Sequence, residues 1–188
     1  MFLKRQDPYH LAVGMTGVKL GDRLAQIGCA DGGRMAAIAS KVGLSGRAVV
    51  VAPDEWSAAL ARKGAANAGV LVEVEIAPPT RLPLENDSTD LVIVDDTAGV
   101  VGSLHADDRA TAMHELLRIV RPGGRAMILG SAPRAGLGAL LHRGAQGPPF
   151  ALSGDANQSL QSGGFTMVRT LAEHEGLVFV EAVKPRQP

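Results

Sequence analysis

Short apolar runs alternate along the chain with segments of helical periodicity. Five runs with a strand-like pattern lie at residues 23–27, 48–52, 70–76, 90–94 and 126–129. Apolar residues at helical spacing predict three helices between them, at residues 35–42, 55–68 and 113–120. This alternation predicts βαβ units, a mostly parallel sheet and helices on both of its faces.

The end of the chain departs from this alternation. Residues 166–172 and 177–183 are two further strand-like runs that only four residues separate. So short a connection allows an antiparallel hairpin but no parallel crossover. The pattern therefore predicts one α/β domain over residues 1–188, with a helical segment at 1–19 and a loop or lid at 134–154.

Composition narrows the class of protein further. The 188 residues carry 19 basic and 19 acidic side chains, and only 3% of them are aromatic. A balanced charge and few aromatic rings argue against a nucleic-acid partner. Cys29 is the single cysteine, so an internal disulfide is excluded, and no run approaches the roughly 18 apolar residues of a membrane span. Without a signal-like start, we expect a cytoplasmic protein with no integral membrane segment.

The turn after the first predicted strand is the strongest candidate for a ligand site. It runs from Gly28 to Gly33 and leads directly into a helix. Glycines let backbone N–H groups approach a ligand, and the start of a helix adds partial positive charge. A tight strand–helix turn also favours glycine without any ligand, so both interpretations stay open here.

Four segments in order resemble one known family. They are Leu20 to Cys29, Leu60 to Gly69, Arg81 to Val92, and Leu116 to Gly124. Together they resemble class I S-adenosylmethionine-dependent methyltransferases of type 11, which include ubiquinone-biosynthesis enzymes. The resemblance covers about residues 14–133. It implies a Rossmann-like, seven-stranded, mostly parallel sheet with a C-terminal antiparallel hairpin, and S-adenosylmethionine as cofactor.

Several positions depart from the family pattern. Gln26 stands where an acid usually ends the first strand, and Ala30 replaces the middle glycine of the turn. Pro53 stands where an acid binds the ribose hydroxyls, and Pro78 where an Asp faces the adenine amino group. The acceptors at these places are lost together. Either neighbouring acids such as Asp31, Asp54 or Glu55 replace them, or the fold binds the cofactor poorly or not at all.

The resemblance transfers a set of site residues onto this sequence. The expected cofactor-binding residues are Gln26, Gly28, Cys29, Ala30, Asp31, Gly32, Asp54, Glu55, Trp56 and Leu82. Trp56 either packs against adenine or anchors the start of its helix. The candidate catalytic residues, Asp95 and Asp96, follow the fourth strand and either orient or deprotonate an acceptor or begin a solvated loop. No histidine has a partner at metal-ligand spacing, so no metal site is expected.

Three functions follow from these observations. The first is methyl transfer from S-adenosylmethionine to a small or lipid-like acceptor. The second is a non-catalytic subunit or scaffold with a degenerate methyltransferase fold, which leaves a homo-oligomer or a protein partner open. The third is a nicotinamide-dependent oxidoreductase, because Gly28, Ala30 and Gly33 approximate a dinucleotide fingerprint. The terminal hairpin and the Arg-Pro-Gly-Gly turn at 121–124 speak against the third.

Overall fold

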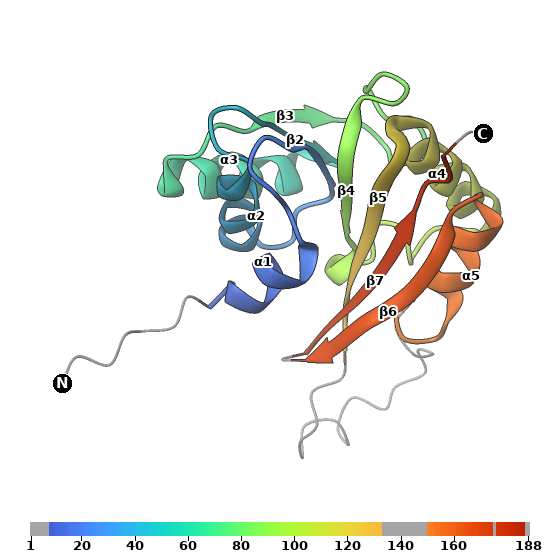
Figure 1. Ribbon diagram of the computed structural model, residues 1–188. Coiled ribbons are helices and arrows are strands. Elements are labelled where there is room, and N and C mark those ends of the chain that lie inside the picture. The colour runs from blue at the N-terminus through green and yellow to red at the C-terminus, as the bar shows by residue number, and fades with distance from the viewer. Residues whose placement is uncertain (1–7, 133–149, 175, 187–188) are drawn as a thin grey trace, which may run out of the picture.

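Seven strands form one mixed sheet in the order β3-β2-β1-β4-β5-β7-β6 (Figure 1). The computed structural model describes residues 8–132, 150–174 and 176–186. The strands are β1 (Arg23–Ile27), β2 (Arg47–Ala52), β3 (Glu73–Ile76), β4 (Thr89–Asp95), β5 (Val120–Ser131), β6 (Thr166–His174) and β7 (Leu177–Val183). Strands β1 to β5 are parallel, whereas β7 pairs antiparallel with both β5 and β6. The predicted fold class and terminal hairpin are confirmed.

Helices cover both faces of this sheet. The α-helices are α1 (His10–Thr16), α2 (Gly32–Ala39), α3 (Glu55–Ala68), α4 (Ala106–Ile119) and α5 (Asp155–Ser162), and short 3₁₀ turns η1 (Ser40–Val42) and η2 (Asp96–Ala98) follow α2 and β4. In Figure 1, α1, α2 and α3 lie together on one side of the sheet, and α4 and α5 lie on the other. None of the described helices has the length and apolarity of a membrane span.

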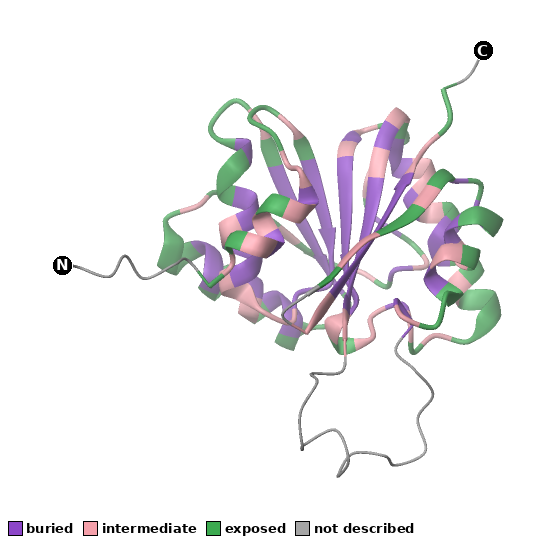
Figure 2. Ribbon diagram, turned by 60° about the horizontal axis from the view of Figure 1, so that its bottom comes forward, coloured by how far each residue is buried: buried purple, intermediate pink, exposed green. Residues whose placement is uncertain are grey.

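Alternation along the central strands divides the core in two. In β4, Leu91 and Ile93 pack with α1, α2 and α3, whereas Val92 and Val94 pack with α4 and α5. All four side chains are fully buried, which explains the uninterrupted apolar run of this strand. Figure 2 shows the buried strands at the centre of the molecule, between helices whose outer surfaces are exposed.

Local signals in the sequence set the ends of the helix that follows β2. The Asp54 carboxylate accepts a hydrogen bond from the Ser57 backbone N–H at 2.8 Å, which caps the first turn of α3. The helix ends at Gly69, whose φ of 65° lies in the left-handed region. The predicted helix at residues 55–68 therefore matches α3 along its whole length.

Arg125 of β5 fastens α1 to the sheet. Its guanidinium donates hydrogen bonds to the carbonyl oxygens of Thr16 and Gly17, at 3.4 and 2.8 Å, and to the Glu181 carboxylate of β7 at 3.0 Å. A cation at the carboxyl end of a helix also complements the helix dipole. The carboxyl end of α1 is thus held by charge as well as by packing.

Several sequence predictions differ from the structure in detail. The helix expected at residues 113–120 is α4, which begins at Ala106 and ends at Ile119, and Val120 belongs to strand β5. The third strand begins at Glu73 rather than at residue 70, and the helix predicted at 35–42 is α2 followed by the turn η1. Strand β5 begins at Val120 and includes Pro122 and both following glycines, with a register shift against β4. Helix α5 was not predicted, and it lies just beyond the expected loop at 134–154, of which residues 134–149 lie outside the described residues. Within the segment at 1–19, the described helix is α1.

Candidate functional site

The turn between β1 and α2 lies at the carboxyl edge of the sheet, beside the end of β4. Gly28 begins it with a φ of 79°, and its N–H donates to the Val51 carbonyl of β2 at 2.8 Å. The buried Gln26 side chain donates from Nε2 to the Gly28 carbonyl at 2.9 Å. Gln26 therefore stabilises the backbone of the turn, a role that a carboxylate, which has no N–H, could not fill in this way.

A serine of α3 holds the next residue of the turn. The Cys29 N–H donates to Ser57 Oγ at 2.9 Å, and the same hydroxyl donates to the Cys29 carbonyl at 3.2 Å. Burial, followed by the nearby Asp95 carboxylate, raises the pKa of the Cys29 thiol to about 12. The Cys29 thiol is consequently buried and neutral and is not a nucleophile, while Ser57 holds the Cys29 backbone.

Asp31 caps α2 and also contacts the N-terminal helix. Its Oδ1 accepts hydrogen bonds from the N–H groups of Gly33 and Arg34, at 2.9 and 3.0 Å. The Tyr9 hydroxyl donates to the same oxygen at 3.2 Å. Asp31 therefore joins α1 and α2 in front of the turn.

A buried ion pair between Arg34 and Asp95 lies beside the turn. Arg34 Nη2 lies 2.8 and 2.9 Å from the two carboxylate oxygens of Asp95, and 2.9 Å from Thr97 Oγ1. The Asp95 side chain is 1% exposed and that of Arg34 is 11% exposed. The Ala30 N–H also donates to Asp95 at 3.1 Å. Asp95 thus holds both the turn and α2.

Asp96 organises the loop that follows β4. Its Oδ1 accepts hydrogen bonds from the N–H groups of Val101 and Gly102, at 2.7 and 2.8 Å. Burial is the main reason that the pKa of this carboxyl lies above its ordinary value, although the two backbone hydrogen bonds act in the opposite direction. Asp95 and Asp96 are therefore neighbours in sequence with different surroundings.

A cavity of about 290 Å³ lies between α1, the turn and the β6–β7 connection. Its polar lining includes Tyr9, Asp31, Arg34, Thr97 and Ser131. Ser131 ends β5, and its hydroxyl donates to the Thr97 carbonyl at 3.2 Å. The cavity thus offers one cation, one carboxylate and several hydroxyl groups at the carboxyl edge, where ligands of open parallel sheets bind.

Protein atoms already lie next to three glycines of the turn. A Cβ on Gly28 would lie 3.1 Å from the Asp95 carbonyl oxygen and 3.2 Å from Val100 Cγ1. A Cβ on Gly33 would collide with the Tyr9 ring, and one on Gly32 would lie inside the backbone of α3 at Leu60. Each of these glycines is therefore explained by packing within the chain.

The end of β2 offers a different set of side chains. Asp54 caps α3, and Glu55 forms an exposed ion pair with Arg62 at 2.6 Å. Trp56 is 64% exposed, which is unusual for the one tryptophan of a chain. Leu82, in contrast, is buried in the core on the side of α4 and α5, and its N–H donates to Glu115 at 2.8 Å. Leu82 therefore shapes the core behind the β3–β4 connection.

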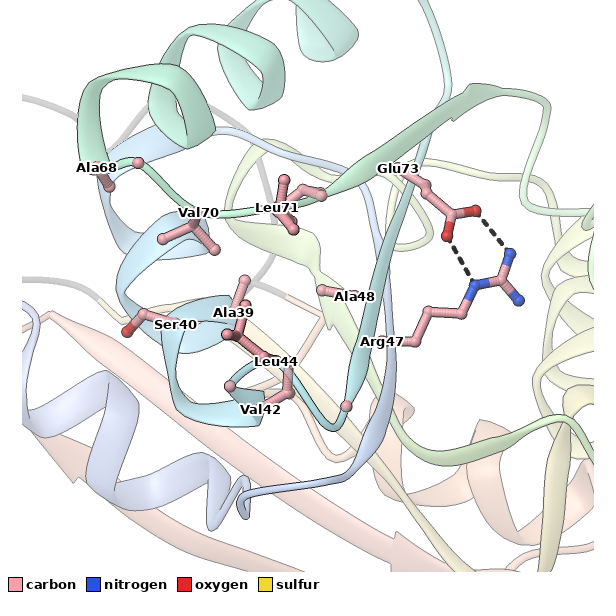
Figure 3. Close-up of a pocket in the computed structure, with 14 residues that line it drawn as sticks. Ala39, Ser40, Val42, Leu44, Arg47, Ala48, Ala68, Val70, Leu71 and Glu73 are labelled. Atoms are coloured by element: carbon pink, nitrogen blue, oxygen red, sulfur yellow. Dashed lines mark hydrogen bonds and ion pairs between the residues drawn. The ribbon is translucent and has the colours of Figure 1, made fainter.

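A larger hollow lies at the edge of the sheet where β2 begins, opposite to the carboxyl edge that carries the turn (Figure 3). It has a volume of about 660 Å³ and lies between the carboxyl ends of α2 and α3 and the start of β2. Small apolar side chains line most of it, and the exposed Arg47–Glu73 ion pair lies at its rim. Its lining offers few groups that could carry out chemistry.

Comparison with known proteins shows where this architecture belongs. The model of a family described as "Methyltransferase domain" matches residues 25–128, which is more than half of the chain. The chain belongs to this methyltransferase-domain family. The matched segment includes the turn, the end of β2 and the Arg34–Asp95 pair. Together with the terminal hairpin, this membership favours the methyltransferase interpretation over a nicotinamide-dependent oxidoreductase.

Curated relatives of the family are similar over part of their length. The ubiquinone/menaquinone biosynthesis C-methyltransferase UbiE of Cupriavidus necator is 27% identical over 117 residues, which cover 62% of this chain and 46% of UbiE. The O-methyltransferase resE of Aspergillus sclerotiorum is 26% identical over 153 residues, 79% of this chain and 56% of resE. The chain thus spans at most 56% of these relatives.

Solved structures share the fold at low sequence identity. A SAM-dependent methyltransferase from Aquifex aeolicus superposes with a TM-score of 0.71 at 18% identity, over 94% of this chain and 89% of that one. The [4+2]-cyclase SpnF superposes with a TM-score of 0.68 at 15% identity, over 95% and 80% of the two chains. The architecture is therefore shared by a methyltransferase and by a protein named for different chemistry.

The predicted site residues fall into three groups. Gly28, Cys29, Ala30, Asp31 and Gly32 form the turn, and Asp95 contacts it directly. Asp54, Glu55 and Trp56 lie at the end of the neighbouring strand β2, whereas Leu82 and Asp96 are held in other surroundings. Their functional roles stay predictions.

Sequence reasoning missed the polar side chains that complete the cavity: Tyr9, Arg34, Thr97 and Ser131. One signal was available for Arg34. A cation in the first turn of a helix opposes the helix dipole, so such a residue calls for an acidic partner or ligand.

Proposed function

We propose that this chain binds S-adenosylmethionine and transfers its methyl group to a small or lipid-like acceptor. The observation that carries the proposal is the polar cavity beside the turn, at the carboxyl edge of a parallel sheet, where ligands of such sheets bind. Membership of the methyltransferase-domain family supports it. When bound, the cofactor supplies an electrophilic methyl group on a positively charged sulfur. In such a displacement, the protein contributes mainly by positioning the two reactants.

Charge at the edge of the sheet supports a cationic ligand. Asp31 and Asp95 lie at the turn and Glu55 begins α3, whereas the cations beside them are Arg34, paired with Asp95, and Arg62, paired with Glu55. The carboxylates therefore exceed the cations by one. A surplus of carboxylates stabilises a sulfonium or ammonium group and gains little from a neutral thioether. The described residues therefore fit the charged end of S-adenosylmethionine.

The nucleoside end must be held differently from the family pattern. Pro53 and Pro78 provide no side-chain acceptor for ribose hydroxyls or for the adenine amino group. Glu55 and Trp56 follow at the start of α3, and both are exposed. We assign the ribose contact to Glu55 and the adenine contact to the face of Trp56, while the turn from Gly28 to Gly32 holds the remainder.

Asp95 is better suited to positioning than to proton removal. It is buried and holds Arg34, Thr97 and the Ala30 N–H in fixed places. Asp96 is committed to two backbone N–H groups of the loop that follows β4. We therefore propose that any proton released by the acceptor passes to solvent. In this proposal, Asp95 holds Arg34, Thr97 and the Ala30 N–H in place beside the acceptor.

A second candidate is a methyltransferase fold that serves as a subunit or scaffold without a cofactor. The observation that favours it is the packing of Tyr9, Val100 and Leu60 against the glycines of the turn. This candidate predicts a partner protein or a second copy of the chain, and no response to any nucleoside. Both candidates are proposed here as one domain that acts in the cytoplasm.

Calorimetric titration with S-adenosylhomocysteine separates the two candidates. We expect saturable binding at micromolar to millimolar ligand and a matching rise of the melting temperature. Because Trp56 is the only tryptophan, stacking of adenine on it must also change tryptophan fluorescence. Trp56→Leu should weaken binding, whereas Leu71→Ala, at the opposite hollow, should not. No heat and no thermal shift at millimolar ligand would favour the scaffold.

Methyl transfer itself is tested with a labelled cofactor. S-adenosylmethionine with a radioactive methyl group would be incubated with the chain and a panel of quinols, phenols and isoprenoid quinols, which reflects the C- and O-methyltransferase relatives. Label in the organic phase that depends on the chain supports the enzyme. Binding without transfer to any of these acceptors would contradict the proposed acceptor class.

A further inference from the structure

Arg34 uses only part of its guanidinium inside the protein. All three of its side-chain hydrogen bonds, to Asp95 and Thr97, are made by Nη2. Within the described ranges, Nε and Nη1 donate to no protein atom. The buried polar atoms left without a partner in that part of the chain are Arg109 Nε and Asn157 Oδ1. The two spare Arg34 nitrogens are therefore not sealed in the core, and Arg34 lines the cavity.

The Asp31 carboxylate, the second charged group of the cavity, also uses only part of its hydrogen-bonding capacity inside the protein. Asp31 accepts its three hydrogen bonds, from Gly33, Arg34 and Tyr9, through Oδ1. Among the described residues, Oδ2 accepts none. The cavity thus presents an anchored cation with spare donors and an anchored carboxylate with a spare oxygen. An α-amino acid group carries the complementary pair, a carboxylate and an ammonium on one carbon.

The size of the cavity agrees with this assignment. Its volume of about 290 Å³ lies just below the roughly 300–1,000 Å³ of sites that enclose a whole drug-sized ligand. It therefore suits the amino-acid end of an S-adenosyl compound better than the nucleoside. The nucleoside end faces Pro53 and Pro78 and the exposed side chains at the start of α3.

We infer that this chain anchors its ligand mainly by the amino-acid end, with Arg34 binding the carboxylate and Asp31 the ammonium group. This inference rests on the proposed function and adds which part of the ligand is selected. Asp95 then acts as a positioning residue, because it fixes the guanidinium through Nη2 and leaves the other nitrogens to the ligand. Such a chain discriminates strongly against nucleosides that lack the amino acid.

The test compares S-adenosylhomocysteine with 5′-methylthioadenosine, which keeps the nucleoside and lacks the amino-acid end. Each is titrated calorimetrically into the wild-type chain, and the ratio of the two dissociation constants is the readout. Because charge-assisted hydrogen bonds contribute about 1.5–3 kcal/mol each, we expect S-adenosylhomocysteine to bind about 100-fold more tightly or better. The ratio is insensitive to a fraction of unfolded protein, since both dissociation constants change together.

Two variants test whether Arg34 is responsible for the difference in affinity between the two compounds. Arg34→Met should weaken S-adenosylhomocysteine about 10- to 100-fold and leave 5′-methylthioadenosine unchanged, so that the ratio collapses. Because this variant leaves the buried Asp95 unpaired, the double variant with Asp95→Asn repeats the measurement without an uncompensated charge. Arg47→Met, which removes an exposed arginine at the opposite edge of the sheet, is the matched control and should keep the wild-type ratio.

The outcomes separate this inference from the proposed function. Equal affinity of the wild-type chain for both compounds, or an unchanged ratio in both Arg34 variants, overturns the assignment while cofactor binding stands. If neither compound binds to the wild-type chain, the proposed function fails and this inference fails with it.

Discussion

The backbones of helices α2 and α3 are in direct contact. This contact predicts that a larger residue at the contact lowers the stability of the chain. A Cβ on Gly64 of α3 would lie well within van der Waals distance of the Gly32 carbonyl group and 2.7 Å from Gly32 Cα. The opposing atoms are backbone, so no flexible side chain can move aside. Gly64→Ala therefore forces the two helices apart by about 1 Å, and overpacking of this kind costs about 1–3 kcal/mol.

The intrinsic helix preference of alanine acts in the opposite direction. Replacing a glycine inside a helix by alanine gains about 1 kcal/mol when nothing else changes. For Gly64→Ala we therefore expect a net loss of up to about 2 kcal/mol, which lowers the melting temperature of a chain of this size by up to about 8 °C.

Gly14 of α1 is the matched control for this substitution. It lies inside a helix, and within the described part of the chain no atom beyond its neighbours and the backbone of its own helix lies within 4 Å of a Cβ placed on it. Gly14→Ala should raise the melting temperature by up to about 4 °C, because only the helix preference acts. Calorimetric melting of both variants checks the pair. A melting temperature of Gly64→Ala at or above the wild-type value would refute the argument from backbone contact.

Three further predictions concern buried and paired groups. Ser57→Ala leaves the buried Cys29 N–H without its acceptor and should lower the free energy of unfolding by about 1–3 kcal/mol, measured in urea. With its pKa raised to about 12, Cys29 should resist iodoacetamide at pH 8 in the native chain and react after unfolding; rapid native labelling would contradict its burial. Hydrogen bonds from Arg23, followed by those from Arg121, hold the pKa of Asp90 well below its ordinary value, so its contribution is present above about pH 4 and is lost as the pH falls further. Asp90→Asn should therefore cost about 1–2 kcal/mol at pH 7 and progressively less below pH 4, whereas a gap independent of pH would count against the ion pair.

The fold could be predicted from the sequence because its signals are local. The apolar run at residues 48–52 is buried on both faces as strand β2, and Asp54 and Gly69 bound α3. The third strand shows the limit of such signals. Residues 70–72 continue the apolar pattern, yet the β3 pairing with β2 starts at Glu73, and residues 70–72 line the hollow at the edge of the sheet without pairing.

The site was harder to predict from the sequence than the fold, because its contacts join segments that are far apart in the chain. Arg34 and Asp95 are 61 residues apart, and nothing in either local pattern indicates that they form a buried pair. The sequence allowed two reasons for the glycines of the turn, a ligand close to the backbone or a tight strand–helix turn, and the structure places Tyr9, Val100 and Leu60 beside them. A glycine can be required by a nearby ligand or by packing against another segment of the chain. The two cases depend on tertiary contacts, which the sequence pattern does not contain.

The attachment of α1 at its two ends has a mechanical consequence. At the carboxyl end, Arg125 grips two carbonyl oxygens and Gly17 adopts a φ of 58°. At the other end, the Tyr9 hydroxyl meets Asp31 through a bond of 3.2 Å. Helix α1, about 10 Å long, is thus held to β5 at its carboxyl end and to Asp31 at its amino end. Any displacement of its amino end from α2 would have to break the Tyr9–Asp31 bond at the edge of the cavity.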